Sequence, residues 1–354
     1  MPNSKATFQE IARRRADLGW TQGELAARAG IPRTTVSAIE GGRLTPSVTA
    51  ALALAGALEC TVEEIFGSGT GVSSAVGQPK WAWQPQSGSC RYWQAEVSGH
   101  YWLYPVESAA LNPVSHDGIW QGGAAKESSP FPAQNTLIIA CCDPAAGWLA
   151  QAYAAASGFR MLVLERSGAD ALELLSRGLI HAAGIHRSTK KQPDRNQESV
   201  QTLLGGNHRL IRIAHWQEGL VLAPGEKSRS LRFHARRDAR WAMREKGSAA
   251  RECMDDLLER TPAEGRCVSG HLAVAEAVRA GWADLGVCVK IAAENASLNF
   301  LPLREEALDL CFPCSATRDP RIVALVRLLR SRHHRRILSE LPGYDARETG
   351  DWIL

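Results

Sequence analysis

The sequence lacks an apolar run that could cross a membrane. Its longest apolar-rich stretch, from Thr49 to Leu58, is well short of the roughly 20 residues that a transmembrane helix needs. The first residues also lack the basic segment, apolar core and small-residue cleavage site that together mark a secretion signal. We therefore expect a cytoplasmic protein that does not act at a membrane.

Motifs of the common enzyme classes are missing as well. The sequence contains no nucleophile elbow and no phosphate-binding loop. A thiolate mechanism would need a cysteine and a histidine base side by side, and sequence alone does not bring such side chains together. The side chains in question are Cys141, Cys142, His181, His186, His215 and His271. We predict that the chain is not an enzyme and carries no cofactor.

Charge of one sign is only weakly in excess, and a net charge of +4 does not by itself indicate nucleic-acid binding. The nine cysteines are an odd number, and in a cytosolic chain we expect them to pack as free thiols. With 354 residues, 45% of them hydrophobic, the chain is long enough for two or three domains. We divide it into a helical domain (1–68), a linker (69–80), a β-hairpin segment with a loop (81–130) and an α/β domain (131–354).

The first domain shows the pattern of an all-α bundle of five short helices. We expect these helices at residues 8–18, 21–29, 32–40, 46–58 and 61–66. Thr21 and Glu24 have the spacing of a capping box, and Gly30 ends the second helix. In the third helix, Val36 and Ile39 fall on the inner face. Its outer face carries an Arg, two Thr and a Ser instead of the Glu and Lys of an ordinary solvated helix, which favours DNA contact over protein contact alone.

The segment TQGELAARAGIPRTTVSAIEGGRLTPSVTAALALAGALECTVEEIF resembles the Xre/Cro-type helix-turn-helix repressor family nearly end to end. In that family the third helix enters the major groove of DNA. The resemblance therefore implies two sets of contacts: base edges for Arg33, Thr34, Thr35 and Ser37, and phosphates for Gln22 and Arg43. It also implies a double-stranded DNA operator as partner and a homodimer, because two recognition helices must reach two half-sites.

A linker and a small β segment follow the helical domain. Residues 67–79 are rich in Gly and Ser, which predicts a flexible linker. Two aromatic-rich runs then flank Ser98-Gly99, the signal of a β-hairpin with a two-residue turn. We expect four indole rings to pack together, although stacking on bases or on a cationic ligand is the alternative: Trp81, Trp83, Trp93 and Trp102. Residues 122–133 are expected to form a loop.

From residue 136 onward, short apolar runs alternate with helical segments, which is typical of a parallel sheet with helices on both faces. The first strands and helices are expected at 137–142, 144–157, 160–164, 169–177 and 181–185. Further apolar runs exceed the need of one small sheet: 210–214, 219–223, 283–289 and 299–303. We therefore predict two α/β lobes.

Three strand-to-helix junctions carry the predicted ligand site, since open α/β sheets bind ligands where strands end and helix N-termini present free N–H groups. The junctions are Cys142-Asp143-Pro144, Ser167-Gly168-Ala169 and Gly247-Ser248-Ala249-Ala250-Arg251. We expect Ser167, Ser248 and Arg251 to bind a small anion between the lobes, together with backbone N–H groups near Asp143 and Gly168. The Asp143 side chain is expected to cap the helix that begins at Pro144.

The region from Asn135 to Tyr344 is similar to the periplasmic-binding-protein-like domain related to molybdate-binding proteins, which is often fused behind helix-turn-helix heads. The resemblance lies in the segments CCDPAAG, SGADALELLSRGLIHAAGIH, REKGSAAREC, HLAVAEAVRAGWADLGVCV and LPGYDARETG. Within them, His186 and His271 join the expected ligand-binding residues. The resemblance implies a ligand-responsive transcription regulator with molybdate or tungstate as effector. Because Met243 and Ala250 stand where the family usually has Asn and Thr, another small anion or an organic effector stays open.

A thiol-based redox or metal sensor is the alternative function. Cys311 and Cys314 have C-x-x-C spacing, and the pair Cys141-Cys142 ends a predicted strand. Against a zinc site stands the lack of a second such motif and of histidines at zinc-finger spacing. The main interpretation therefore assigns no metal ligands.

The groove assignment predicts two kinds of DNA-binding defect. Arg33→Ala or Thr35→Ala should weaken specific binding and relax base preference, each by roughly 1–3 kcal/mol if it contacts a base edge. Arg43→Ala should weaken binding to all sequences alike, because a phosphate contact carries no sequence information. Gel-shift titrations with specific and unrelated duplexes distinguish the two, and unchanged affinity in all three variants would contradict the assignment.

Overall fold

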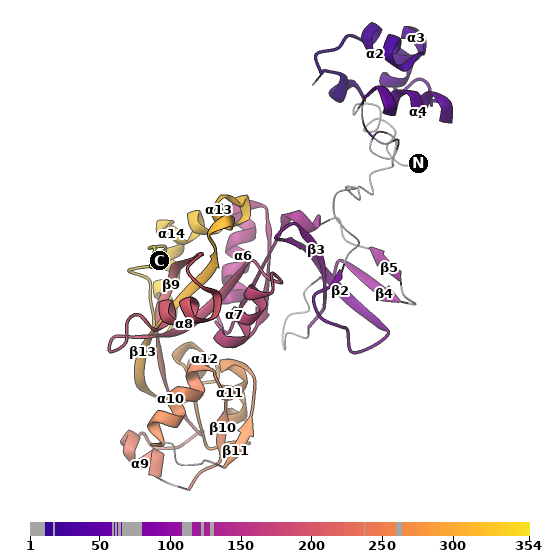
Figure 1. Cartoon of the computed structure of the whole chain (residues 1–354). Helices are drawn as coiled ribbons and strands as arrows, with labels where there is room; N and C mark the ends of the chain where they lie inside the picture. Colours follow the sequence, from indigo (N-terminus) through magenta and orange to yellow (C-terminus); the bar gives the residue numbers. More distant parts are fainter. Residues whose placement is uncertain are drawn as a thin grey trace. The chain divides into compact units, whose positions relative to one another are not determined.

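A computed structural model describes residues 11–16, 18–58, 60, 62, 65, 80–107, 115–121, 124–127, 131–236, 238–259 and 264–354. The chain divides into two compact units, Met1–Gly77 and Gln78–Leu354, and each is described by itself (Figure 1). The predicted linker lies outside the described residues except for Lys80, and so does most of the fifth predicted helix of the head.

The first unit, here called the head, is a bundle of short helices. Residues 11–16 are helical and are followed by α2 (Gln22–Ala29), α3 (Arg33–Glu40) and α4 (Val48–Ala57). The predicted capping box is confirmed: Glu24 N–H donates to Thr21 Oγ1 (3.2 Å) and Thr21 N–H donates to Glu24 Oε2 (2.6 Å). Val36 and Ile39 are buried, as their spacing predicts, and pack in the core of the head.

Glu40, the last residue of α3, accepts hydrogen bonds from side chains of two other helices of the head. The guanidinium of Arg15, in the first helix, donates to both carboxylate oxygens at 2.7 and 3.1 Å. The side-chain amide of Gln22, at the start of α2, donates to Oε2 at 2.8 Å. A bidentate pair of this kind is directional, so it sets the angle of α3 against its neighbours.

The second unit begins with a five-stranded sheet of order β1-β3-β2-β4-β5. Its strands are β1 (Lys80–Trp81), β2 (Ser89–Val97), β3 (His100–Pro105), β4 (Gly118–Gln121) and β5 (Ala124–Glu127). The predicted hairpin is confirmed, since Val97 pairs with His100 and both turn residues have positive φ (Ser98 53°, Gly99 75°). The expected loop at 122–133 was wrong in part, because β5 lies within it and pairs with β4.

The four predicted tryptophans do not form one cluster. Trp83, Trp93 and Trp102 belong to one core, whereas Trp81 packs edge-on against Tyr92 and Trp120. The reason is the alternation of side chains along a strand, which sends Tyr92 and Trp93 of β2 to opposite faces.

One face of this sheet packs on the α/β domain. Trp93, Val97 and Tyr104 share a hydrophobic core with side chains of the first α/β strands and helices. Arg160 clamps both carboxylate oxygens of Asp117 at 2.6 Å, and the Tyr104 hydroxyl donates to the carbonyl of Leu179 at 2.7 Å. The sheet is therefore part of the unit Gln78–Leu354, and a boundary at residue 131 cuts through a shared core.

The α/β domain has two lobes joined by a nine-stranded sheet of order β11-β10-β12-β9-β13-β8-β6-β7, with β14 beside β9 (Figure 1). Lobe 1 contains η1 (Ala133–Asn135), β6 (Thr136–Cys141), α6 (Ala146–Ser157), β7 (Arg160–Glu165), α7 (Gly168–Ser176), β8 (Ala182–Thr189), α8 (Arg195–Leu204), η2 (Cys314–Arg318), α13 (Pro320–Leu329), α14 (Arg332–Glu340) and β14 (Tyr344–Asp345). Lobe 2 contains α9 (Leu231–Arg236), β10 (Trp241–Met243), α10 (Ala249–Leu257), β11 (Gly265–Cys267), α11 (Gly270–Arg279), β12 (Leu285–Val289) and α12 (Lys290–Asn295).

Two long antiparallel strands connect the lobes: β9 (His208–Leu222) and β13 (Phe300–Pro313). The apolar runs 210–214 and 219–223, which suggested two strands, are one strand, because the polar residues between them also pair with β13. The prediction of a purely parallel sheet was wrong at this place. Strands pair in parallel within each lobe, and the crossing strands β9 and β13 pair antiparallel with β12 and β8.

None of the helices among the described residues is both long and apolar enough to cross a membrane.

His181 makes the stability of the second unit depend on pH. Its Nδ1 accepts from Ile138 N–H (2.9 Å), a hydrogen bond that requires the neutral ring, and its Nε2 then donates to the Glu96 carbonyl (3.0 Å). Burial, helped by the charge of Arg321, lowers the pKa of His181 from 6.5 to about 4. Below pH 6.5 the unfolded chain binds a proton at His181, whereas the folded chain does not bind it until the pH approaches 4. We expect a loss of about 1.4 kcal/mol per pH unit between pH 6.5 and 4, about 3 kcal/mol in all.

Urea unfolding followed by tryptophan fluorescence at several pH values tests this effect. His181→Gln should be less stable at neutral pH but should lack this part of the pH dependence. His100→Gln, at an exposed position in the hairpin, is the matched control and should keep the wild-type slope. Equal slopes for wild type and His181→Gln would contradict the prediction.

The shared core also predicts where the second unit can be cut. A chain that begins at Gln78 should fold cooperatively, whereas one that begins at residue 131 should expose the apolar surface that Trp93, Val97 and Tyr104 cover. The shorter chain is expected to bind a hydrophobic dye and to melt at lower temperature. Equal melting temperatures for the two chains would show that the β sheet contributes nothing.

Candidate ligand site between the lobes

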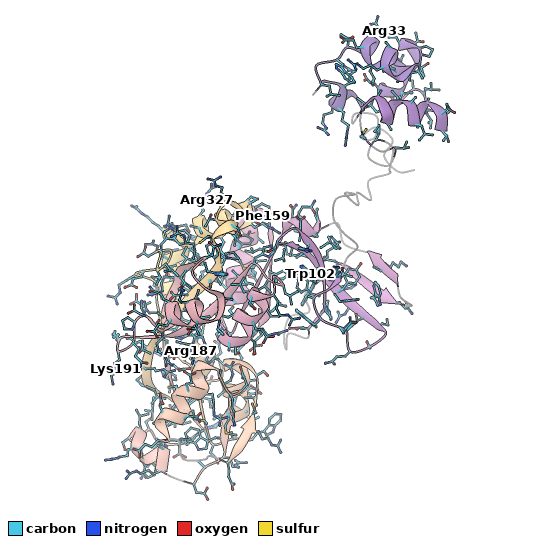
Figure 2. All side chains as sticks on the ribbon, in the orientation of Figure 1. Arg33, Trp102, Phe159, Arg187, Lys191 and Arg327 are labelled. Carbon is cyan, nitrogen blue, oxygen red and sulfur yellow. The ribbon has the colours of Figure 1, made fainter. Side chains whose placement is uncertain are left out.

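The residues predicted to contact DNA lie on and around α3. Arg33 and Thr34 are exposed in its first turn, Thr35 and Ser37 are half-buried, and Figure 2 shows Arg33 on the outer side of the head. Arg43 is exposed just beyond the helix. The Gln22 amide is bound to Glu40, which orients its side chain at the start of α2. The assignment of these residues to bases and phosphates stays a prediction.

Three side chains that are distant in sequence meet between the lobes. They are Cys142, which follows β6, His186 in β8, and His271 in the first turn of α11. The Sγ atom of Cys142 lies 3.0 Å from Nε2 of His186 and 3.7 Å from Nε2 of His271. All three side chains are buried, with 4%, 3% and 0% exposure. Two come from lobe 1 and one from lobe 2, so the cluster exists only when the lobes are closed.

Glu306 of β13 holds His186 in place. Its Oε2 accepts from Nδ1 of His186 at 2.6 Å and from the indole N–H of Trp216 at 3.2 Å. Arg304 binds the other oxygen, Oε1, at 2.7 Å. With Nδ1 donating to a carboxylate, the Nε2 atom of His186 is left facing Cys142.

The electrostatics of the two histidines differ. Burial disfavours the charged form of both. At His186 the neighbouring Cys142 and Glu218 outweigh burial and raise the pKa, whereas at His271 burial, together with Arg244 and His186, lowers the pKa well below 6.5. The Nδ1 atom of His271 is buried without a hydrogen-bond partner among the described residues.

Arg244 brings a positive charge to the same place. It follows β10, is 3% exposed, and forms two hydrogen bonds of 2.8 and 2.7 Å with Glu245. Its Nη1 group is buried and has no hydrogen-bond partner among the described residues. A buried guanidinium with a free donor is costly unless something binds it, which makes Arg244 a candidate ligand contact.

A second group of charges lies where β9 and β13 cross between the lobes. Glu218 of β9 is fully buried, and Arg304 reaches it at 3.1 Å. Burial and the neighbouring carboxylate of Glu306 raise the pKa of Glu218 to about 8. This acid–arginine–acid arrangement connects the crossing strands to His186 through Glu306.

Several contacts close the lobes over the cluster. Arg187 of β8 is ion-paired with Glu252 of α10, and Figure 2 shows Arg187 at the junction of the lobes. At Gly270 the backbone passes so close to Glu165 that a Cβ atom would lie 1.6 Å from its Oε1. The Glu165 carboxylate thus lies at the N-terminus of α11, a favourable place for negative charge.

The predicted ligand residues at the three junctions make hydrogen bonds within the protein. Asp143 follows Cys142, and its Oδ1 accepts from Ala145 N–H at 2.8 Å, but α6 begins at Ala146 without a side-chain cap, so the predicted cap of a helix beginning at Pro144 was wrong. Ser167 and Ser248 instead use their hydroxyls as N-caps of α7 and α10. Arg251 pairs with Asp255 of its own helix at 2.9 Å. The hydroxyls and Arg251 are thus engaged by nearby protein groups, whereas Nη1 of Arg244 has no hydrogen-bond partner among the described residues.

The remaining predicted positions are the histidines and a glycine. His186 and His271 are in the cluster, whereas Gly168 is the first residue of α7 and packs against Ile185 of β8. The ligand-binding roles of these residues stay predictions.

The cysteines of the alternative sensor do not come together. Cys311 lies in β13 within the core beneath the five-stranded sheet, and burial raises the pKa of its thiol to about 12. Cys141 lies in the core on the other face, where burial raises its thiol pKa as well. Among the described residues, the group of side chains that could hold a metal ion contains a single cysteine, Cys142. The C-x-x-C spacing reflects the end of a strand followed by η2.

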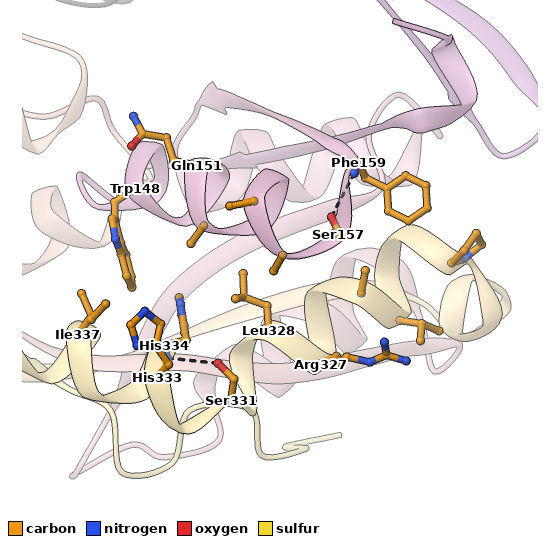
Figure 3. Close-up of a pocket in the computed structure, with 16 residues that line it drawn as sticks. Trp148, Gln151, Ser157, Phe159, Arg327, Leu328, Ser331, His333, His334 and Ile337 are labelled. Atoms are coloured by element: carbon orange, nitrogen blue, oxygen red, sulfur yellow. Dashed lines mark hydrogen bonds between the residues drawn. The ribbon is translucent and has the colours of Figure 1, made fainter.

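A separate groove of about 890 Å³ lies on lobe 1 between α6, α13 and α14 (Figure 3). Its lining is mostly apolar, and Trp148 stacks on His334 with ring centres 4.7 Å apart. Its hydroxyls are engaged in helix contacts, since Ser331 caps α14 and Ser157 donates to the Tyr153 carbonyl. The groove contains one buried polar atom without a hydrogen-bond partner among the described residues, Nδ1 of His334, whereas the site between the lobes combines such atoms from His271 and Arg244.

Residues 150–330, about half of the chain, match a family described as PBP superfamily domain, and residues 11–65 match a helix-turn-helix family. The chain belongs to the PBP superfamily. Its N-terminal unit is an Xre-type helix-turn-helix domain, as the sequence predicted.

This PBP-superfamily chain is similar to several known proteins, of which three are described here. YvgK of Bacillus subtilis, an uncharacterized protein, is 30% identical over 187 residues, which are 50% of this chain and 60% of YvgK. An uncharacterized HTH-type transcriptional regulator of Methanothermobacter thermautotrophicus is 46% identical over 57 residues, 16% of this chain and 83% of that protein. The methylphosphonate complex of PhnD1 from Prochlorococcus marinus is 10% identical, with a TM-score of 0.43 over 60% of this chain and 92% of its own. The chain thus spans less than two thirds of YvgK.

The sequence analysis missed three residues of the candidate site between the lobes: Trp216, Arg244 and Glu306. It named a fourth, Cys142, only as part of the alternative thiol sensor. The polar residues inside otherwise apolar strands were the available signal. Glu306 and Glu218 interrupt runs that form buried strands, where an ionisable residue needs a partner. The identity of that partner depends on strand register, which the sequence does not reveal.

Proposed function

We propose that the protein is a ligand-responsive transcription regulator that works in the cytoplasm as a homodimer. The helix-turn-helix head binds operator DNA through α3, and the two-lobed domain binds a small anion between its lobes. The observation that carries this proposal is Arg244, a buried cation with a free donor, between the lobes of a domain fused to a DNA-binding head.

As the effector, an oxyanion suits the buried guanidinium of Arg244 better than an organic cation or an apolar molecule does. Arg244 offers a guanidinium N–H, and the thiol and imidazoles of the cluster offer further polar atoms. Asp143 and Glu165 are the opposing features, but burial raises the pKa of both carboxyls, which reduces the negative charge that an anion meets. Molybdate and tungstate are the effectors that the sequence resemblance favours, and sulfate and phosphate are their competitors.

Ligand binding would act on DNA through closure of the lobes. An effector that contacts both lobes binds the closed form better, and only such a difference in affinity can shift the equilibrium. In a dimer the shift would change the spacing of two heads that must reach half-sites about one helical turn apart.

Operator binding tests the proposal. Duplexes selected from random DNA by the full chain supply the operator, and fluorescence anisotropy then measures affinity with molybdate, tungstate, sulfate or phosphate. One of these anions should change operator affinity by at least about fivefold. Unchanged affinity with all four would remove support for an oxyanion effector.

A matched pair of variants locates the effector. Arg244→Gln should lose the response to the anion while keeping the affinity for operator in its absence. Arg240→Gln, at an exposed arginine of the same lobe that pairs with Asp284, should respond like wild type. A full response in Arg244→Gln would place the effector elsewhere.

A further inference from the structure

The cluster between the lobes has the composition and the spacing of a metal centre. A tetrahedral zinc ion with one sulfur and two nitrogen ligands holds its ligand atoms about 3.3–3.6 Å from one another. Around Cys142 the corresponding distances are 3.0 and 3.7 Å, and the three ligand atoms all lie within 4.8 Å of one another. Small side-chain rotations therefore bring Sγ and both Nε2 atoms to coordination distance.

The surroundings of the cluster are also those of a metal ligand set. The carboxylate of Glu306 accepts from Nδ1 of His186, which leaves Nε2 as the coordinating atom. Trp216 and Arg304 fix that carboxylate in turn. Carboxylate–histidine–metal arrangements of this kind orient the ring and raise its affinity for the ion.

A thiolate–imidazolium pair for nucleophilic chemistry is the other use of Cys142 and His186. Such a pair needs one imidazole, and the second, His271, would have no role in it. His271 comes from the opposite lobe, points its Nε2 at the same sulfur, and is completely buried. Two imidazoles aimed at one thiol favour coordination.

We propose that Cys142, His186 and His271 bind a divalent transition-metal ion, zinc in the first place, with the fourth coordination position open to the anion that Arg244 attracts. The proposal rests on the ligand site proposed above and names what completes it. On binding, Cys142 Sγ and the two Nε2 atoms each donate a lone pair to the ion, and the thiol proton passes to solvent. Because His271 belongs to lobe 2, the ion links the lobes and stabilises their closed form.

Cobalt(II) replaces zinc in such sites and reports its ligands by colour. The full chain, stripped with a chelator and kept reduced, is titrated with CoCl2 without DNA or oxyanion. We expect one equivalent to bind, with a thiolate-to-cobalt charge-transfer band and the intense visible bands of tetrahedral coordination, and ZnCl2 should then displace the cobalt. A titration without a thiolate band would overturn the proposal.

Variants assign the ligands. Cys142→Ser should abolish the charge-transfer band, and His186→Gln and His271→Gln should each weaken binding by more than about a hundredfold, while Glu306→Gln should weaken it by about 10–100-fold. Cys267→Ser and His333→Gln, at an exposed cysteine and an exposed histidine outside the cluster, should bind like wild type. Circular dichroism confirms that each variant is folded, and wild-type affinity in folded His271→Gln would overturn the assignment.

The outcome is separable from that of the regulator proposal. Cobalt binding needs no operator, so a chain that binds cobalt but whose operator affinity none of the four oxyanions changes supports this proposal and contradicts the regulatory one. An oxyanion response that persists in chelator, with no cobalt bound, does the reverse. Rapid alkylation of Cys142 by iodoacetamide that zinc does not slow would indicate a nucleophilic thiol and overturn the metal site.

Discussion

The pairing of β9 with β13 is the constraint on which the second unit depends. The two strands pair from Phe300–Val221 in one lobe to Pro313–His208 in the other, with two interruptions of register near the middle. Each lobe adds its parallel strands to the flanks of this ribbon, so neither lobe is independent of it. The register also decides which side chains meet: Glu306 faces Trp216, and Arg304 faces Glu218.

The polar residues on this ribbon are costly for stability. Glu218, Glu306 and Asp309 are completely buried, in strands whose other buried side chains are mostly apolar. Replacing a buried ion pair with apolar residues is often neutral or stabilising, so stability alone does not account for them. Their arrangement is explained by what they orient, because Glu306 positions His186 and Arg304 neutralises two carboxylates beside it.

Closure of the lobes brings a cation, a ring nitrogen and a thiol together in a buried place. Within the part of the chain that the structure describes, Nη1 of Arg244 and Nδ1 of His271 have no hydrogen-bond partner, and Cys142 lies within reach of two imidazoles. In low dielectric each of these groups gains more from a bound ion than it would in water. A site that charged species complete, and that contains residues from both lobes, has the physical basis for coupling ligand binding to a change of shape.

The sequence by itself determined what depends on neighbours along the chain. The capping box at Thr21 and Glu24, the burial of Val36 and Ile39, the turn at Ser98-Gly99 and the alternation of strands and helices after residue 136 were predictable, because each is a local pattern with one period or one turn geometry. Family-level resemblance added the Xre-type head and the two-lobed domain. Only the tertiary structure decided which polar groups meet. Cys142, His186 and His271 are separated by 44 to 129 positions, and strand register together with lobe closure brings them together, so their proximity is a property of long-range pairing that no local pattern encodes.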